Sequence, residues 1–495
     1  MKSMKTWLSA LLAVMMLLAM TGIAMAADAV PTGSITVENL EPGETVTIYQ
    51  VIEIESDGTA ALKDPKWVSG IQAWITTTYP EYADAANLPA DGSATVSKST
   101  FYNALSGQLA SLTAVKNEQV TATTCTVENL PIGSYMVLVM GGEKAHEAYL
   151  TSIRATKYNF EKAEWVVESG VVNAADKCKT PNVEKKEDKT TAAIGDKVTF
   201  TVDSDVPTYP ASAYDVVYKL EDIMAEGLTF NGDLKAYGIN ATGKKELTPG
   251  TEFKADYTQS TTEGKTKIFK LEFDYSLIKD YTQIELAYSA TVNEKIKIGS
   301  NQNTNEVKFT YDHKEKSDYT VLYSFGFDLT KHADSQTGEL LPGAEFELSQ
   351  AGKALKFKKL SDGHYAVDPT GETKLVTGEN GKMKGKIIVD GLNVGAYTLK
   401  ETKAPDNFNL MQGEKDVTIT QNSDAQEKHL LANTNDPENS KSAYWYQTVV
   451  DKRISGLPAT GGMGTTIFMV AGIAVMACAV VALMVVLKRQ KRSEG

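Results

Sequence analysis

An apolar segment near the C-terminus constrains this chain more than any other feature. The 21 residues from Ile467 to Leu487 carry no charge, and a basic cluster begins directly after them at Lys488. A segment of this length can cross a bilayer as a helix, and the basic flank favours the cytoplasmic side. The sequence therefore predicts a C-terminal transmembrane helix, with the rest of the mature chain outside the cell.

The N-terminus has the features of a secretory signal. Lys2 and Lys5 precede an apolar stretch from Leu8 to Leu18, and small residues at 24–26 suit a cleavage site. We therefore expect residues 1–26 to be removed. The alternative is a membrane protein with two ordinary anchors, but the first apolar stretch is short for a span.

The region between these ends has the pattern of β-strands. Short alternating runs, such as those at 34–37, 197–202 and 345–348, are separated by Gly, Pro, Asn and Asp. Alternation with a period of two, bounded by turn residues, is typical of strands that bury one face. We therefore expect an all-β region of tandem sandwiches. A helix is expected only locally, near Lys98 to Leu112.

Two charged stretches divide this region. One, at 177–181, contains a proline, and the other, near 311–319, is polar. The roughly 430 residues between the two ends suit about three domains. The expected order is a signal peptide at 1–26, a first domain at 27–176, a middle domain at 177–320, a last domain at 321–455 and a sorting and anchoring tail at 456–495.

Charge and composition argue against several functions. The net charge is −13 with both signs interspersed, which does not suit a nucleic-acid partner. No nucleophile, base and orienting group form a recognisable set, which argues against a turnover enzyme. The histidines lack paired metal-ligand spacing, so we expect no metal or cofactor and surface positions for all of them. They are His146, His313, His332, His364 and His429.

Three cysteines are too few for a disulfide framework. Cys478 lies in the apolar tail, whereas Cys125 and Cys178 can either pair or stay free, because spacing alone does not place them together. If disulfides do not stabilise these domains, another feature of the chain can take that role.

An internal sequence repeat indicates that related sandwich domains recur along the chain. Residues 127–135 parallel residues 389–397, and residues 37–43 form a weaker third copy. Counting on from the shared glycines places Val139 where the later copy has Glu401. The two copies therefore differ at a position that can carry chemistry.

In the last domain, three inward strand faces each end in an ionisable group. The alternating sets are Phe325, Phe327, Leu329 and Lys331; Tyr397, Leu399 and Glu401; and Val449 and Asp451. Burial of an amine and two carboxyls is costly unless they pair or lose charge. Burial lowers the pKa of an amine and raises that of a carboxyl, which leaves a neutral nucleophile beside a protonated acid. Held together, such groups are expected to form an amide bond once, without an external enzyme.

The middle domain repeats this arrangement with other residues. Its inward sets are Val183 and Lys185; Tyr218, Leu220 and Asp222; and Asn305, Val307, Phe309 and Tyr311. Lys186 is a competitor for the amine, and only the alternation disfavours it. The alternative is a plain sandwich whose polar groups lie at the rim.

The C-terminal tail resembles the sorting signal of Gram-positive surface proteins, in which a pentapeptide precedes the membrane span and basic end. The pentapeptide here consists of Leu457, Pro458, Ala459, Thr460 and Gly461. The resemblance implies cleavage between Thr460 and Gly461 by a sortase.

The last domain looks like the collagen-adhesin B-type domain of Gram-positive pilins, an immunoglobulin-like sandwich. Lys331, the run 341–348 and the run 397–405 carry this resemblance. It implies an isopeptide bond from Lys331, assisted by Glu401. Pilins usually supply an asparagine as acceptor near the sorting signal, whereas this chain has Asp451, which would release water instead of ammonia. The alternative acceptors are Asn433 and Asn435.

The middle domain is similar to the fimbrial isopeptide-formation domain of the same pilins. Runs at 194–196 and 227–230 add to the resemblance. It implies that Lys185 is the amine, Asn305 the acceptor and Asp222 the assisting acid. In the first domain Val139 replaces the acid and Gln50 lies near the expected amine position, so we expect no bond there.

The stretch 171–181 looks like a loose variant of the pilin motif whose lysine is joined to the next subunit. The usual Tyr-Pro-Lys is missing, and the resemblance favours Lys177, with Lys179 as the alternative. Together the motifs predict the shaft subunit of a pilus on the cell surface. Its expected partners are a class C-type pilin sortase, identical subunits in a head-to-tail filament, accessory pilins and peptidoglycan. The alternative is a monomeric wall-anchored adhesin, which needs no linker lysine.

Overall fold

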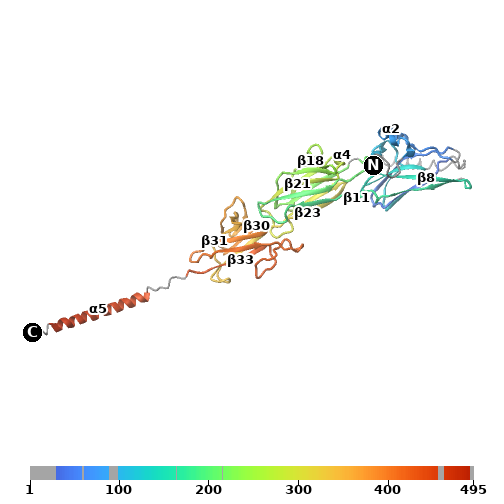
Figure 1. The fold of residues 1–495 in the computed structure, drawn as a ribbon. Helices are drawn as coiled ribbons and strands as arrows, with labels where there is room; N and C mark the ends of the chain where they lie inside the picture. The colour runs from blue at the N-terminus through green and yellow to red at the C-terminus, as the bar shows by residue number, and fades with distance from the viewer. Residues whose placement is uncertain are drawn as a thin grey trace, which may run out of the picture.

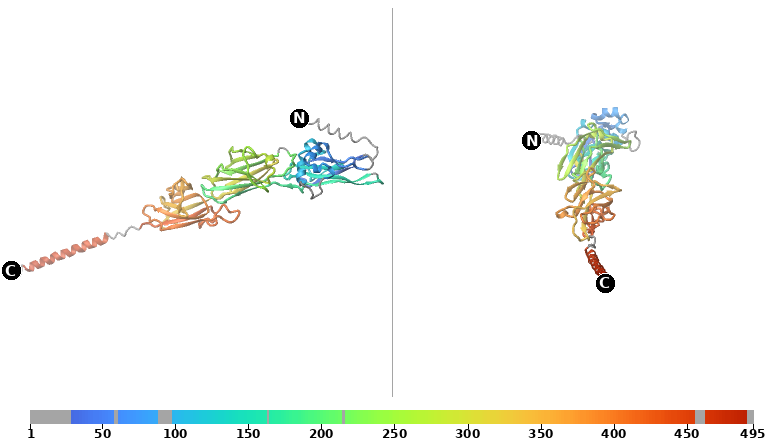
Figure 2. Two further views of the ribbon diagram at one scale, coloured as in Figure 1. Left: turned by 45° about the horizontal axis from the view of Figure 1, so that its top comes forward. Right: turned by 90° about the vertical axis from the view of Figure 1, so that its left-hand side faces the viewer.

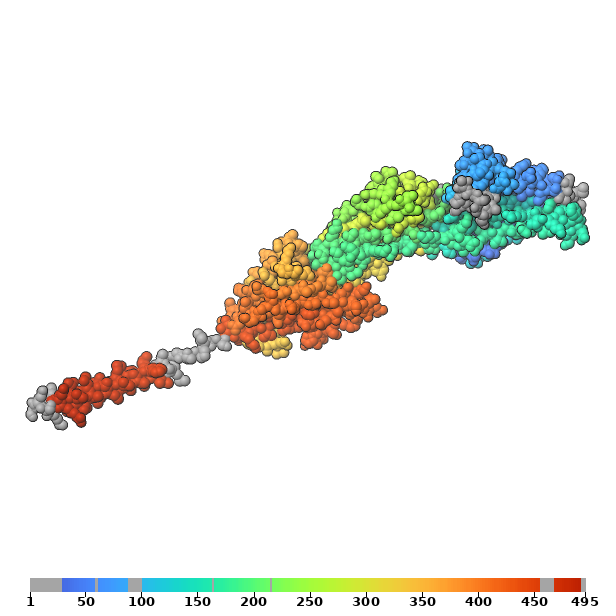
Figure 3. Space-filling view, in the orientation of Figure 1, coloured from blue at the N-terminus to red at the C-terminus, as the bar shows by residue number. Residues whose placement is uncertain are grey.

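The computed structural model describes residues 29–57, 61–87, 98–162, 164–213, 216–454 and 462–490. The signal peptide and the pentapeptide 457–461 lie outside these residues. Figure 1 shows three sheet-containing units in a row, followed by a single long helix, and Figure 2 shows the same row from two other sides. The space-filling view shows that the units touch end to end (Figure 3). The all-β prediction with a C-terminal helix is confirmed.

The first unit contains a small sheet in the order β10-β1-β5 and a larger sheet in the order β3-β2-β6-β8-β9, with β4 also paired to β2. Its strands are β1 (Thr32–Glu38), β2 (Thr45–Glu53), β3 (Lys66–Trp67), β4 (Lys116–Gln119), β5 (Thr124–Pro131), β6 (Gly133–Met140), β7 (Ala145–His146), β8 (Tyr149–Asn159), β9 (Glu164–Glu168) and β10 (Gly170–Asn173). A short strand β11 (Cys178–Lys179) follows and pairs with β7.

Helices cover one side of this unit. The elements are α2 (Ser69–Thr78), η1 (Pro80–Tyr82), η2 (Ala85–Asn87), α3 (Lys98–Ser106) and η3 (Leu109–Ser111). The last two fall in the stretch predicted to be helical, whereas α2 was not predicted. It buries Ile71 and Ile75, four residues apart, in a cluster with Trp67 and Phe101. One such pair is too short a periodic signal to stand out in the sequence.

The middle unit is a sandwich of two six-stranded sheets, β12-β13-β21-β16-β17 with β15 on β21, and β18-β20-β14-β22-β23 with β19 on β20. Its elements are β12 (Val183–Glu187), β13 (Lys197–Asp205), β14 (Tyr218–Ala225), β15 (Leu228–Phe230), β16 (Lys235–Asn240), β17 (Gly243–Glu246), β18 (Phe253–Asp256), β19 (Ser260–Thr262), β20 (Lys265–Phe273), α4 (Tyr275–Ile278), β21 (Gln283–Val292), β22 (Thr304–Tyr311) and β23 (Lys314–Val321).

The last unit packs the sheet β27-β28-β30-β24-β33 on the sheet β26-β25-β31-β32, with β29 on β25. Its elements are β24 (Phe325–Ala333), β25 (Glu345–Gln350), β26 (Lys353–Ala354), β27 (Phe357–Ser361), β28 (His364–Val367), β29 (Leu375–Val376), η4 (Gly381–Met383), β30 (Lys386–Leu392), β31 (Gly395–Lys403), β32 (Glu414–Ile419) and β33 (Tyr444–Asp451). The first strand, β24, and the last, β33, are parallel neighbours.

The middle and last units share one continuous hydrophobic core. At their junction the amide of Ile194 donates to the carbonyl of Gly391 at 3.0 Å. Gly391 has a positive φ of 86°, and a Cβ there would lie 2.3 Å from Cδ1 of Ile194. Only glycine therefore allows this close packing of the two units.

The C-terminal helix α5 (Gly462–Gln490) matches the predicted anchor. The most apolar stretch of 18 residues within 467–490 has a mean hydropathy of 2.9, and none of it is buried against the rest of the protein. An exposed apolar helix of this length is suited to a lipid environment.

Candidate functional site

The middle unit brings together three residues predicted from alternation. Lys185 comes from β12, Asp222 from β14 and Asn305 from β22. The Nζ of Lys185 donates to Oδ1 of Asn305 at 2.8 Å and is in contact with Oδ2 of Asp222. The side chains of Lys185 and Asp222 are fully shielded from solvent. The neighbouring Lys186 is exposed and pairs with surface carboxylates, so it does not reach this site.

Burial controls the ionisation of this pair. It lowers the pKa of the Lys185 amine, although the Asp222 carboxylate acts in the opposite direction. It also raises the pKa of Asp222, against the attraction of Lys185 and the hydrogen bond from Tyr288. Because loss of hydration outweighs attraction for both groups, the site favours a neutral amine beside a protonated carboxyl. These are the forms that a nucleophile and a proton donor need.

Tyr288 is a fourth member of this cluster, and the sequence analysis did not identify it. Its hydroxyl accepts from Lys185 Nζ at 2.6 Å and from Asn305 Nδ2 at 3.2 Å, and it donates to Asp222 Oδ2. Tyr288 lies on β21, where Ile284, Leu286, Tyr288, Ala290 and Val292 alternate inward. The same period-two reasoning applied to residues 283–292 would have placed it in the core.

The last unit brings together Lys331, Glu401 and Asp451, also as predicted. They come from β24, β31 and β33, and their side chains are fully shielded from solvent. Lys331 Nζ lies 2.7 Å from Oε1 of Glu401, in contact with Oδ1 of Asp451, and 5.4 Å from the ring centre of Phe346. None of these close amine–carboxyl contacts has hydrogen-bond geometry. The close approach of the amine to the two carboxyls must therefore offset the lost hydration of all three groups.

Glu401 is held by the chain around it. Its Oε2 accepts from the amide of Met411 at 2.7 Å. Burial raises the pKa of the Glu401 carboxyl, against the lowering effect of that hydrogen bond and of Lys331. A protonated carboxyl at this position can donate a proton.

The alternative acceptors lie elsewhere. Asn433 and Asn435 are exposed, and the side chain of Asn433 accepts from the amide of Asn435. Asn435 donates from its side chain to the carbonyl of Tyr446 at 2.9 Å. The residue that the structure places against the Lys331 amine is Asp451.

The first unit has a different buried polar cluster. Val139 is buried and paired with Val46, and Gln50 donates to the carbonyl of Ile52 at 3.3 Å. This cluster instead contains Glu44 and His146, whose Oε1 and Nε2 lie 2.8 Å apart.

The prediction that all histidines lie at the surface is therefore wrong for His146. Its ring is 1% exposed, and Nδ1 lies 3.0 Å from the hydroxyl of Tyr149, which donates to the carbonyl of Ala174 at 2.6 Å. His146 sits in the two-residue strand β7, which is too short to show periodicity. A buried polar chain of this kind is stable only when each member is paired.

We expect His146→Ala to destabilise the first unit, because it leaves Glu44 buried without its partner. The expected cost is about 3 to 5 kcal/mol in the free energy of unfolding. Denaturant unfolding of the ectodomain measures it, with His429→Ala in a partly exposed loop as the control. Equal stability of the two variants would contradict this role for His146.

The linker lysines lie beside this cluster. β11 pairs with β7, so that Cys178 is opposite His146, and Figure 1 shows β11 at the junction of the first and middle units. Lys177 is partly buried, with Nζ 5.4 Å from the ring centre of Tyr102. Lys179 is more exposed and lies 2.8 Å from Asp205. Cys125 and Cys178 are both free thiols.

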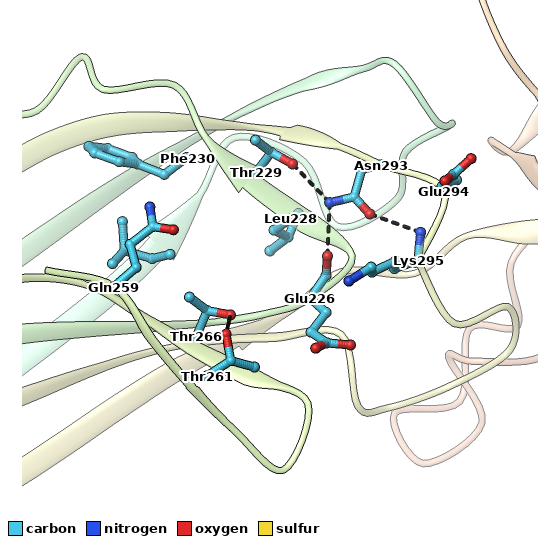
Figure 4. A pocket seen from close by; sticks show the side chains of 11 residues that line it. Glu226, Leu228, Thr229, Phe230, Gln259, Thr261, Thr266, Asn293, Glu294 and Lys295 are labelled. Atoms are coloured by element: carbon cyan, nitrogen blue, oxygen red, sulfur yellow. Dashed lines mark hydrogen bonds between the residues drawn. The ribbon is translucent and has the colours of Figure 1, made fainter. Parts of the chain in front are cut away.

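A surface cavity of about 390 Å³ lies in the middle unit, between β15 and the β19–β20 hairpin (Figure 4). Among the side chains that line it, Asn293 donates to the carbonyl of Glu226 and to the hydroxyl of Thr229, each at 2.8 Å. Thr261 and Thr266 bond to each other. The hydrogen-bonding groups named here are therefore paired with one another. Within the described ranges, no cluster of His, Cys, Asp and Glu could hold a metal ion.

Comparisons with known proteins follow the same division. Residues 194–315 match the model of Gram-positive pilin backbone subunit 2, a Cna-B-like domain, and residues 327–433 match SpaA, a prealbumin-like fold domain. The trypsin-resistant surface T6 protein of Streptococcus pyogenes serotype M6 is 22% identical over 453 residues, covering 82% of this chain and 76% of that protein. A solved structure, that of the T6 backbone pilin of serotype M6 Streptococcus pyogenes, has a modular three-domain structure. Its alignment with this chain covers 86% of this chain and 99% of the T6 chain, with 17% sequence identity and a TM-score of 0.51. Together, the matched domains and relatives support a Gram-positive backbone pilin.

Proposed function

We propose that this chain is the shaft subunit of a covalently polymerised surface pilus, stabilised by two internal isopeptide bonds. Its domains are residues 27–176, 177–320 and 321–455. One observation carries the proposal: two separate sandwiches each bury a lysine amine against a carboxyl and an acyl acceptor. A lysine at the surface is hydrated and needs no partner. Burial of a lysine amine costs free energy unless the amine pairs with an acid or reacts.

In the middle domain the neutral amine of Lys185 attacks the side-chain carbonyl carbon of Asn305. A C–N bond forms, the carboxamide nitrogen leaves as ammonia, and Asp222 serves as the acid. In the last domain Lys331 attacks the carboxyl carbon of Asp451, and water leaves with assistance from Glu401. Fixed proximity replaces an external enzyme, and each bond forms once.

Polymerisation uses the two ends of the subunit. A pilin sortase cleaves between Thr460 and Gly461 and joins Thr460 to Lys177, or to Lys179, of the next subunit. Because the donor and acceptor lie at different places on the subunit, repetition gives an open head-to-tail filament. The finished fibre is attached to peptidoglycan and carries accessory pilins.

The intact mass of the purified ectodomain tests the internal bonds. We expect it to fall short of the translated mass by about 35 Da, from one ammonia of about 17 Da and one water of about 18 Da. Peptide mapping should recover Lys185 linked to Asn305 and Lys331 linked to Asp451. An ectodomain with its full translated mass would refute both bonds.

A further inference from the structure

The two lysine sites differ in one chemical respect. In the middle domain the hydroxyl of Tyr288 touches the amine, the acid and the acceptor. In the last domain, among the described residues, the groups recorded against Lys331 Nζ are Glu401, Asp451 and the ring of Phe346. The site whose acceptor is an amide has the hydroxyl, and the site whose acceptor is an acid does not.

The contacts of Asn305 explain why this difference matters. Its Oδ1 accepts from Lys185 Nζ at 2.8 Å, and its Nδ2, the nitrogen that must leave, donates to the Tyr288 hydroxyl at 3.2 Å. Asp222 contacts Lys185 and Tyr288 through the same oxygen, and its other oxygen has no hydrogen-bond partner. In the described structure, Tyr288 therefore bridges the acid to the leaving group.

We propose that Tyr288 is a catalytic residue of the middle-domain reaction and carries a proton from Asp222 to the departing nitrogen of Asn305. This inference rests on the proposed function, because it assigns a step within the Lys185–Asn305 bond.

The proton balance closes within the four side chains. The lone pair of Lys185 Nζ forms the bond to Cγ of Asn305, and the Cγ–Nδ2 bond breaks. In the tetrahedral adduct Nδ2 has a lone pair, so the two hydrogen bonds reverse: Nδ2 takes the hydroxyl proton of Tyr288 and leaves as ammonia, while Tyr288 takes the proton of Asp222 from Oδ2. Asp222 then takes the proton that Nζ loses. An amine and a carboxamide give an amide and ammonia, and both Tyr288 and Asp222 return to their starting forms.

An amide nitrogen has a particular need for this relay, because it is a poor leaving group until it is protonated. At the last site the departing oxygen belongs to the carboxyl of Asp451, which can carry a proton itself. The relay is therefore needed in the middle domain and dispensable in the last one.

Packing holds the Tyr288 hydroxyl in position. The residue is 2% exposed, and its ring lies 5.7 Å from that of Phe200, 5.2 Å from that of Phe269 and 6.1 Å from that of Phe230, measured between ring centres. Burial and the neighbouring Asp222 raise the pKa of Tyr288 well above its ordinary value. The hydroxyl therefore stays protonated and acts by passing a proton on.

Tyr288→Phe tests the relay in the whole ectodomain, because it keeps the ring and removes only the hydroxyl. The ectodomain is synthesised in a cell-free system, quenched in acid at intervals and weighed. We expect the loss of about 17 Da to slow by roughly 100-fold or more, a usual effect of removing a general acid. The loss of about 18 Da from the last domain is the internal control for folding and timing.

Tyr218→Phe is the matched control variant. Tyr218 is also buried in the middle domain, and its hydroxyl bonds to Ser204 at 2.6 Å, away from the lysine. Its removal should leave both mass losses at the wild-type rate. Loss of the middle bond in both variants to the same extent would overturn the relay, because any buried hydroxyl would then have the same effect.

A second substitution separates chemistry from folding. Tyr288→Phe combined with Asn305→Asp gives the middle site a lysine, two carboxyls and no hydroxyl, as in the last domain. We expect this double variant to regain the bond, now with loss of about 18 Da. If the double variant stays uncrosslinked, Tyr288 is needed for structure only and the relay is wrong. A Tyr288→Phe ectodomain that reacts at the wild-type rate also overturns the relay but leaves the proposed function intact. A wild-type ectodomain without either mass loss refutes the proposed function itself.

Discussion

An ectodomain that carries both Asp222→Ala and Glu401→Ala is expected to keep its full translated mass. Each substitution removes the acid that serves one lysine, so neither bond can form at a useful rate. Lys185 and Asn305 are 120 residues apart, and Lys331 and Asp451 have the same separation. By the loop-entropy argument developed for disulfides, each missing link lowers the free energy of unfolding by about 4 to 5 kcal/mol. Intact mass and thermal unfolding together measure both effects.

The single variants and a surface control make this result specific. Asp222→Ala should abolish only the ammonia loss, and Glu401→Ala only the water loss. Lys186→Ala replaces the exposed neighbour of Lys185, so it should leave both mass losses in place and change the free energy of unfolding by no more than about 0.5 kcal/mol. A double variant that still loses about 35 Da would show that neither acid takes part.

Lys177→Arg is expected to remove the ladder of polymers from cell-wall extracts boiled in detergent. Arginine keeps the positive charge beside the Tyr102 ring, but its guanidinium stays protonated and is no nucleophile. The subunits should then run as a single species, attached to the wall through Thr460 but not to one another. The measurement is immunoblotting of wall extracts from cells that express each variant in place of the wild type.

Lys179→Arg is the matched control for this experiment. Lys179 lies two residues away and pairs with Asp205 on the surface, so its replacement should leave the ladder intact. A ladder that disappears only with Lys179→Arg would assign the linkage to the alternative lysine. A ladder absent from the wild type would favour the monomeric wall-anchored adhesin.

Strand alternation was enough to place the candidate lysines, acids and acceptors in the core. Lys185 falls on the five-residue strand β12 and Asp222 on the eight-residue strand β14, and in both strands the period of two indicates which face is buried. The preference for Lys185 over Lys186 follows from the same rule. Residue spacing within each strand was therefore sufficient to select the lysines, acids and acceptors, but it did not identify Tyr288.

The features that the sequence analysis missed depend on contacts between distant segments of the chain. Tyr288 lies inward on β21, but its place beside Lys185 follows from the sheet order β12-β13-β21, which no local pattern encodes. Glu44 precedes β2 and His146 lies in a two-residue strand, so neither has a periodic context. Their pairing became visible only once residues 102 positions apart were brought together.

The parallel pairing of β24 and β33 has a mechanical consequence. Because the two strands run in the same direction, the chain enters the last sandwich at one end and leaves at the other. Lys331 lies near the end of β24, and Asp451 is the final residue of β33. If the proposed bond joins these residues, a pull along the fibre passes from β24 across that bond and directly out toward the sorting signal. The strands between Lys331 and Asp451 in the sequence then bear none of the load. Tension along the fibre therefore cannot unfold and extend this part of the sandwich.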